Sequence, residues 1–231
     1  MPQLLEAFRI ALDMIISGDP VVFSIAFRTL MISVSATLLA ALIFIPVACL
    51  IHFSRFRGKR FLTSIIQTLF SVPTVFVGML VFLLISRAGP LGSLGMLFTP
   101  GAIVLGEVLL IAPIITGLMI STLSSMGKDI SDTAISLGAG QLQMVLKVLS
   151  ESRYMVLTTI LLGFGRAVSE IGVAIIVGGN ISGHTRTLTT AIALGVGKGE
   201  TSASIALGII LLALAMIVSL TVNTLRHRGK R

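Results

Sequence analysis

Glu107, Arg166 and Glu170 are ionisable side chains that lie inside long apolar segments of this chain. A charge in a bilayer costs about 2.5 kcal/mol or more unless it is paired or hydrated, so each of them must avoid lipid. Arg166 and Glu170 are spaced i and i+4, which puts them on one face of a helix where they can pair. They are candidates for a transport path or its gate, and a structural pair between packed helices is the alternative. Glu107 lies near the end of its segment, where hydration is a sufficient explanation.

Prolines within the same apolar segments offer a second kind of chemistry. Pro73, Pro100 and Pro113 can bend or break a helix, and the freed backbone groups can then line a cavity. Packing alone explains each proline equally well. We place Pro73 together with Arg166 and Glu170 on the candidate path or gate.

Metal, nucleotide and covalent chemistry find little support in the sequence. His52, His184 and His227 are far apart, and Cys49 is the single cysteine. The glycine-rich residues 195–199 lack the Lys-Ser/Thr ending of a phosphate loop and are expected to form a flexible outer loop. We therefore expect no metal, no cofactor and no catalytic residue in this chain.

The composition indicates a membrane protein. Of 231 residues 55% are hydrophobic and 11% charged, and the mean hydropathy is +1.07. With no Trp, one Tyr and basic residues spread between apolar segments, nucleic-acid binding is disfavoured. A helix needs about 20 apolar residues to cross a bilayer. The expected fold is all-α, with about five transmembrane helices near residues 25–51, 62–85, 101–123, 154–177 and 203–224.

The ends and connections of these segments predict their orientation. Residues 1–23 have apolar side chains at helical spacing and no basic leader, so we expect a retained amphipathic helix at the membrane interface. Basic residues favour the cytoplasmic side. One set of connections holds Arg55, Arg57, Lys59, Arg60, Lys128, Lys147, Arg153, Arg226, Arg228, Lys230 and Arg231. The other holds only Arg9, Arg28, Arg87, Arg186 and Lys198, which predicts an outer N-terminus and a basic cytoplasmic tail at residues 223–231.

A polar stretch at residues 124–153 separates the third and fourth apolar segments and is too long for a turn. Its apolar residues recur at helical spacing, which predicts short amphipathic helices. Gly138 stands where such a helix would end, and it permits a positive φ and close approach of another backbone. An ordinary cytoplasmic connection capped by glycine is the alternative.

Within this stretch Asp132-Thr133-Ala134, followed by Gly138, resembles the loop of bacterial ABC-importer permeases, whose pattern is Glu-Ala-Ala, three residues, then Gly. Asp and Thr stand here in place of Glu and the first Ala. Residues 71–78 and 165–172 resemble segments of molybdate-type permeases. Residues 177–194, and Glu151-Ser152-Arg153 in place of Leu-Pro, are most similar to the tungstate branch. The resemblance covers residues 24–222.

The resemblance implies a type I ABC-importer permease fold over residues 24–222, in the multi-pass plasma membrane of a bacterium or archaeon, carrying tungstate or otherwise molybdate. It implies a homodimer, two cytoplasmic ABC ATPase subunits that bind the ATP, and an external substrate-binding protein. The coupling loop would be residues 127–152, and its ATPase-coupling residues Asp132, Thr133, Ala134, Gly138, Ala139 and Gly140. Two alternatives remain: a permease for another solute such as sulfate, and an ion-coupled secondary transporter using Glu170 and Arg166.

Overall fold

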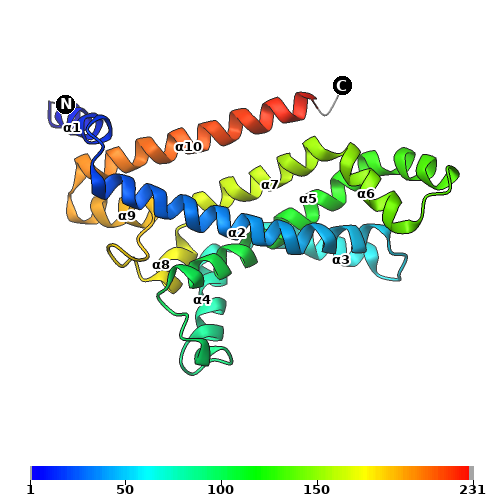
Figure 1. Ribbon diagram of the computed structural model, residues 1–231. Coiled ribbons are helices and arrows are strands. Elements are labelled where there is room, and N and C mark those ends of the chain that lie inside the picture. Colours follow the sequence, from blue (N-terminus) through cyan, green and yellow to red (C-terminus); the bar gives the residue numbers. More distant parts are fainter. Residues whose placement is uncertain (1, 229–231) are drawn as a thin grey trace.

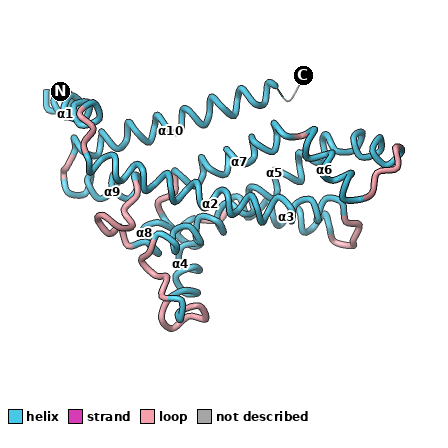
Figure 2. Tube along the Cα trace, in the orientation of Figure 1, coloured by secondary structure: helices cyan, strands magenta, loops and turns pink. Residues whose placement is uncertain are grey.

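The computed structural model describes residues 2–228, and the side chains of residues 5–125 and 129–228. The described chain is built from helices and connecting loops (Figures 1 and 2). The helices are α1 (Pro2–Ile16), α2 (Pro20–Phe53), α3 (Lys59–Thr68), α4 (Thr74–Ile85), α5 (Pro100–Ser136), α6 (Gln141–Glu151), α7 (Arg153–Val168), α8 (Gly172–Gly178), α9 (Leu188–Lys198) and α10 (Thr201–Arg228). Short 3₁₀ turns occupy Leu69–Ser71 and Gly92–Leu94. The all-α prediction is confirmed.

Three helices are long and apolar enough to cross a membrane: α2, the Pro100–Ser125 part of α5, and α10. Two further pairs pass the same test only when each bent pair is taken as one span, which gives up to five spans. Residues 59–85 bend by 101° and residues 153–178 by 59°. The five predicted segments are therefore present, but those at 62–85 and 154–177 are broken helices and not straight ones.

The first break follows from the sequence around Pro73. The residue before a proline avoids the helical region, and Val72 is extended, with ψ 131°. Pro73 then stands at the N-cap position of α4. Pro100 lies at the start of α5, where its missing N–H costs nothing, and Thr99 Oγ1 accepts the Ala102 N–H. Pro113 remains inside α5, so the expectation that it could break its helix is wrong; neighbouring helices bury α5 and hold it together.

The helix α5 is the centre of the fold. It packs along α2 over most of its length and also contacts α3, α4, α6, α7 and α8. Its buried side chains include Ile103, Ile111, Ile115, Met119 and Leu123, all fully enclosed. Both broken spans and α6 are thus held against this one helix.

Two connections differ from expectation. The first half of the polar stretch is not a separate short helix but the last three turns of α5, which continues to Ser136. Its second half is α6, as the apolar spacing predicts. The glycine-rich residues 195–198 are the end of α9, not a flexible loop, and Gly199 ends this helix with φ +77°.

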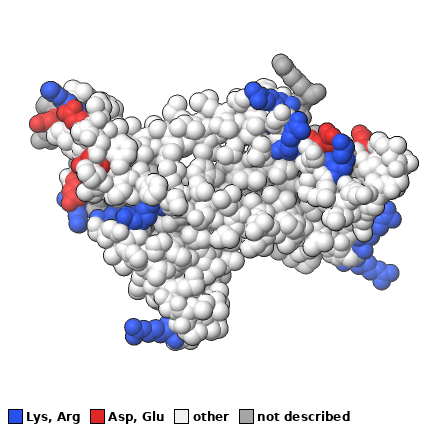
Figure 3. Space-filling model, viewed as in Figure 1, with Lys and Arg blue, Asp and Glu red and all other residues white. Residues whose placement is uncertain are grey.

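In this view most charged side chains gather at the two ends of the long helices, a further basic side chain lies at the lower tip beyond α4, and the surface between them is uncharged (Figure 3). The helix α1 lies at one end and packs on α10, and the turn after α5 lies at the other end (Figure 1). The predicted tail is helical as far as Arg228, the last residue of α10. The side chain of Lys128, and Lys230 and Arg231 entirely, lie outside the described residues, and the orientation remains a prediction.

Candidate functional site

The turn between α5 and α6 has the hydrogen bonds of a Schellman motif. The Gly138 N–H donates to Ile135 O at 2.9 Å, and the Ala139 N–H donates to Ala134 O at 3.0 Å. Gly138 has φ +82°, the left-handed conformation that glycine adopts without penalty. Gly140 is the N-cap of α6, and its N–H donates to Gln143 Oε1 at 3.0 Å. The prediction of a sharp glycine turn is confirmed in its geometry.

The predicted coupling residues divide between surface and core. Asp132, Thr133, Gly138 and Gly140 are exposed, Ala139 is half-buried and Ala134 is buried. Thr133 Oγ1 donates to Asp129 O at 2.8 Å, so this hydroxyl is occupied by its own helix. The structure therefore brings the six residues to one tip, with the acid and the glycines facing outward.

An apolar groove of about 630 Å³ opens beside this turn. It is lined by Asp129, Ile130, Thr133, Ala134, Leu137, Ala139, Gln143, Lys147 and Glu151. Leu137 at its rim is 83% exposed and Leu142 nearby is 72% exposed. Apolar side chains this exposed at a polar tip are characteristic of a binding surface.

One ion pair stabilises the far wall of the groove. Lys147 Nζ donates to Glu151 Oε1 at 2.7 Å along the surface of α6. This hydrogen bond, with the positive charge of Lys147, holds the pKa of Glu151 below its ordinary value. A depressed carboxyl pKa means that the pair is intact above the ordinary glutamate range and is lost only as the pH falls through the lowered pKa.

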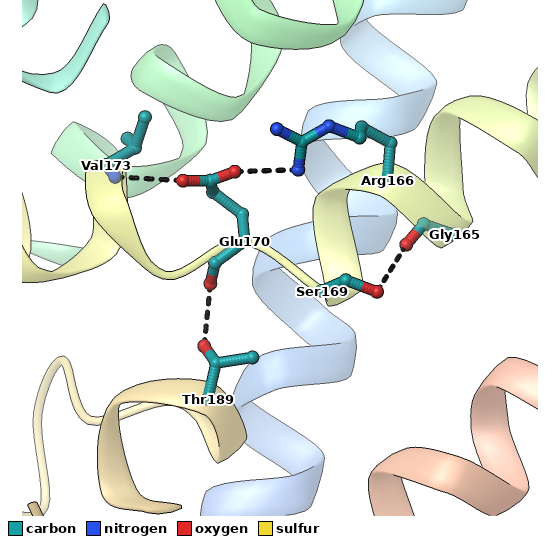
Figure 4. A network of polar contacts seen from close by, with 6 residues as sticks. All are labelled: Gly165, Arg166, Ser169, Glu170, Val173 and Thr189. Carbon is teal, nitrogen blue, oxygen red and sulfur yellow. Dashed lines mark hydrogen bonds and ion pairs between the residues drawn. The ribbon is translucent and has the colours of Figure 1, made fainter. Parts of the chain in front are cut away.

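Arg166 and Glu170 meet at the break between α7 and α8 (Figure 4). Arg166 Nη1 donates to Glu170 Oε2 at 2.8 Å, and the Val173 N–H at the start of α8 donates to Glu170 Oε1 at 3.1 Å. The Thr189 hydroxyl, from α9, donates to the Glu170 carbonyl at 2.6 Å. The Glu170 side chain is 1% exposed and that of Arg166 33%. The predicted pair is present, and it also caps α8 and joins it to α9.

The two helix breaks lie side by side. A Cβ added at Gly172 would come within 2.6 Å of Thr74 Oγ1 and 3.0 Å of Val75 N, which shows how closely the start of α4 approaches the start of α8. Gly78, one turn further along α4, is equally close to the Val173 backbone, at 3.1 Å. Exposed Pro73 is therefore brought to the Glu170 region, whereas the coupling residues lie at the other end of α5.

Glu107 is not hydrated, contrary to expectation. It is 2% exposed on the inner face of α5. Ser33 Oγ faces it from α2, yet neither Ser33 Oγ nor Glu107 Oε2 has a hydrogen-bond partner of good geometry among the described residues. The part of α5 that carries Glu107 is more buried than its position near the end of an apolar segment suggests.

Three further residues complete this polar region: Ser33, Thr189 and Val173. None of them was predicted from the sequence. The buried hydroxyls next to Ser33 on α2 bond back to their own helix, as Thr29 does to Ile25 O and Thr37 to Ser33 O, but Ser33 does not. A serine in an apolar helix gives no sign of this in the sequence. Thr189 belongs to the run of threonines in residues 185–190, whose density was the available signal. Within the described residues, no group of three or more His, Cys, Asp and Glu could hold a metal ion.

Bent helix pairs packed around a central helix, with the Arg166–Glu170 ion pair at one bend, are the features of a polytopic membrane protein. The fold is that of an inward-facing crystal structure of the MetNI methionine ABC transporter, with a TM-score of 0.72 and 16% identity, covering 91% of this chain and 97% of the other. The predicted type I ABC-importer permease fold is thus confirmed.

The sequence identifies the family. Residues 44–231 match the family described as binding-protein-dependent transport system inner membrane component, and the chain belongs to it. Two relatives agree with this. The tungstate uptake system permease protein TupB of Peptoclostridium acidaminophilum is 39% identical over 83% of this chain and 84% of its own. A probable anion ABC transporter permease protein of Haloferax volcanii is 40% identical over 73% of this chain and 75% of its own.

Proposed function

We propose that this chain is the membrane-spanning permease subunit of an ATP-binding-cassette importer that carries an oxyanion, tungstate in first place and molybdate in second. Two copies form the pore, an external binding protein delivers the anion, and two cytoplasmic ATPase subunits bind and hydrolyse ATP. The relative named as a tungstate uptake permease, alike over most of both chains, supports this choice of substrate.

The observation that carries the proposal is the tip at Gly138. A left-handed glycine ends α5, exposed Leu137 stands beside it, and an apolar groove opens next to both. We assign this tip to the ATPase contact, made by Asp132, Thr133, Ala134, Gly138, Ala139 and Gly140. Because α5 is continuous, displacement of the tip moves the helix that contacts both broken spans.

The pathway is assigned to the region of Pro73, Arg166 and Glu170. An anion crossing a low-dielectric region is repelled by unpaired carboxylates. Arg166 neutralises Glu170 through the 2.8 Å contact, and a third of its own side chain remains exposed to meet a passing anion. The adjacent helix breaks supply the points at which α4 and α8 rock between inward-open and outward-open states.

The test is uptake of tungstate by vesicles containing the permease, its ATPase and its binding protein, with molybdate and sulfate as competitors. A Cβ added at Gly138 meets no heavy atom within 4 Å, and Asp enters the left-handed region more readily than most residues, so Gly138→Asp opposes docking with backbone strain as its structural cost. Gly18→Asp is the matched control, because Gly18 is also left-handed, with φ +71°, and open. Uptake should be lost in the first variant and kept in the second.

Full ATP-dependent uptake by Gly138→Asp would refute the assignment of the tip. Sulfate that competes as strongly as tungstate would refute the substrate. Uptake that persists without the ATPase and loses its pH dependence in Glu170→Gln would instead favour an ion-coupled transporter.

A further inference from the structure

A cationic hollow lies where α2 ends, α3 begins and α5 passes beside both. It consists of two adjoining concavities of about 790 and 360 Å³, which share Lys59 and Ser124 on their walls. The larger extends along α3 past Arg60 and Thr63, and the smaller extends toward Arg55 and His52. The end of α2, the start of α3 and the adjacent part of α5 thus surround the ammonium group of Lys59.

The hollow is lined by positive charge with no negative charge opposite. Arg55, Lys59 and Arg60 line it, and no Asp or Glu is among its lining residues. Within the described residues the ion pairs join Lys147 to Glu151 and Arg166 to Glu170, both elsewhere. The groove beside the Gly138 turn differs, because Asp129 and Glu151 offset Lys147 there. An uncompensated cluster of this kind attracts an anion from solution or from the membrane surface.

The ammonium and hydroxyl groups at the centre of the hollow are held by hydrogen bonds. Lys59 Nζ donates to His52 O and, at 3.3 Å, to Ser54 O, so the ammonium clamps the end of α2 to the start of α3. Ser124 Oγ donates to Ile120 O at 2.7 Å and lies 3.4 Å from His52 Nδ1. Arg55 and Arg60 are exposed at the two mouths. Two guanidinium forks around a fixed ammonium suit an anion with several oxygens.

We propose that this hollow binds a tetrahedral oxyanion, the chemistry shared by the phosphate of an anionic phospholipid and by a free oxyanion. The inference rests on the proposed function only for the choice of tungstate as a probe. Guanidinium groups of Arg55 and Arg60 bind the oxygens, and Lys59 supplies the central charge.

The test uses the full-length chain in nanodiscs of zwitterionic lipid, with inorganic phosphate and tungstate titrated by calorimetry. Arg55→Gln and Arg60→Gln remove one lining charge each. Arg57→Gln is the matched control, because Arg57 is exposed in the same loop but lines neither concavity. Each lining variant should raise the Kd about fivefold, and the control should leave it unchanged, since an exposed charge contact is worth about 1 kcal/mol. Lys59 is left intact because its clamp is structural.

A second arm distinguishes the two sources. Nanodiscs with phosphatidylglycerol are examined by native mass spectrometry for retained lipid. If the titrations show the pattern above, the site takes a free oxyanion. The other outcome is that free anions do not bind, that Arg55→Gln and Arg60→Gln lose retained phosphatidylglycerol, and that Arg57→Gln keeps it. In that case the site takes the lipid phosphate. Equal effects of all three arginines, or no binding in either arm, would overturn the proposal. Neither arm involves ATPase or uptake, so failure here is separable from failure of the transport function.

Discussion

Arg166 Nη1 lies 2.8 Å from Glu170 Oε2, and the two side chains bridge the break between α7 and α8 while differing in exposure, 33% against 1%. The pair is therefore asymmetric. Part of the Arg166 side chain remains open to its surroundings if its partner is lost, whereas Glu170 is enclosed by the protein.

This asymmetry predicts unequal costs for the two single substitutions. Arg166→Gln leaves a buried carboxylate without its cation and should cost about 3 kcal/mol. Glu170→Gln keeps an oxygen for the Val173 N–H and should cost only about 1.5 kcal/mol. The midpoint of thermal unfolding of the purified protein shows which single variant is less stable. The double variant should recover part of the stability that Arg166→Gln loses. Equal unfolding midpoints for the two single variants would contradict the unequal costs inferred from the two side-chain exposures.

Glu107 should tolerate loss of its charge. No cation pairs with it among the described residues, and Glu107→Gln keeps the volume while offering an N–H to Ser33 Oγ. Since an unpaired buried carboxylate is unfavourable, the thermal midpoint of Glu107→Gln should equal or exceed that of the native chain. Glu107→Ala, which leaves a cavity against α2, is the comparison and should lower it. A lower midpoint for the glutamine variant would mean that the charge itself is used.

Substitutions at Gly138 should follow backbone conformation and not size. Gly138→Ala meets no atom within 4 Å but must adopt φ +82°, at a cost of about 1–2 kcal/mol. Gly138→Asn should cost less because asparagine enters this region more readily. Binding of the ATPase subunit should therefore weaken more for alanine than for asparagine. Gly197→Ala, in α9 away from the tip and with no atom within 4 Å of an added Cβ, is the control and should bind normally.

Gly172 should be far less tolerant than Gly165. A Cβ at Gly172 would lie 2.6 Å from Thr74 Oγ1 and 3.0 Å from Val75 N, so Gly172→Ala forces α4 and α8 apart at a cost of about 1–3 kcal/mol. At Gly165 the nearest atom is Val218 Cγ1 at 3.5 Å, and alanine improves helix propensity. The thermal unfolding midpoint and tungstate uptake should both fall for Gly172→Ala, and neither should fall for Gly165→Ala. Retained uptake with a lowered midpoint would indicate that the contact is only structural.

The apolar segments could be predicted from the sequence because their length and hydropathy are set by the bilayer. The breaks within these segments could not be predicted from hydropathy, because an average over 20 residues does not respond to one extended residue. Val72 before Pro73 was a readable signal, but Ser169–Ile171 contains no proline and bends because Glu170 caps the next helix. Pro113, with the same apparent signal as Pro73, sits in an unbroken helix.

The candidate site was predictable to the extent that its chemistry is local. The pairing of Arg166 with Glu170 follows from their spacing, and the turn at Gly138 follows from the conformational freedom of glycine. The burial of Glu107 and the approach of Ser33 depend on how α2 packs on α5, which is contact between residues far apart in sequence.

The unbroken run of α5 from Pro100 to Ser136 has a mechanical consequence. At 1.5 Å per residue it is a rod of roughly 55 Å, so a tilt of roughly 5° about one end sweeps the other through roughly 5 Å. The exposed tip and the buried Glu107 are points on this same lever arm. A small rotation of α5 about its Pro100 end is thereby converted into a displacement of the turn about as long as a helical turn.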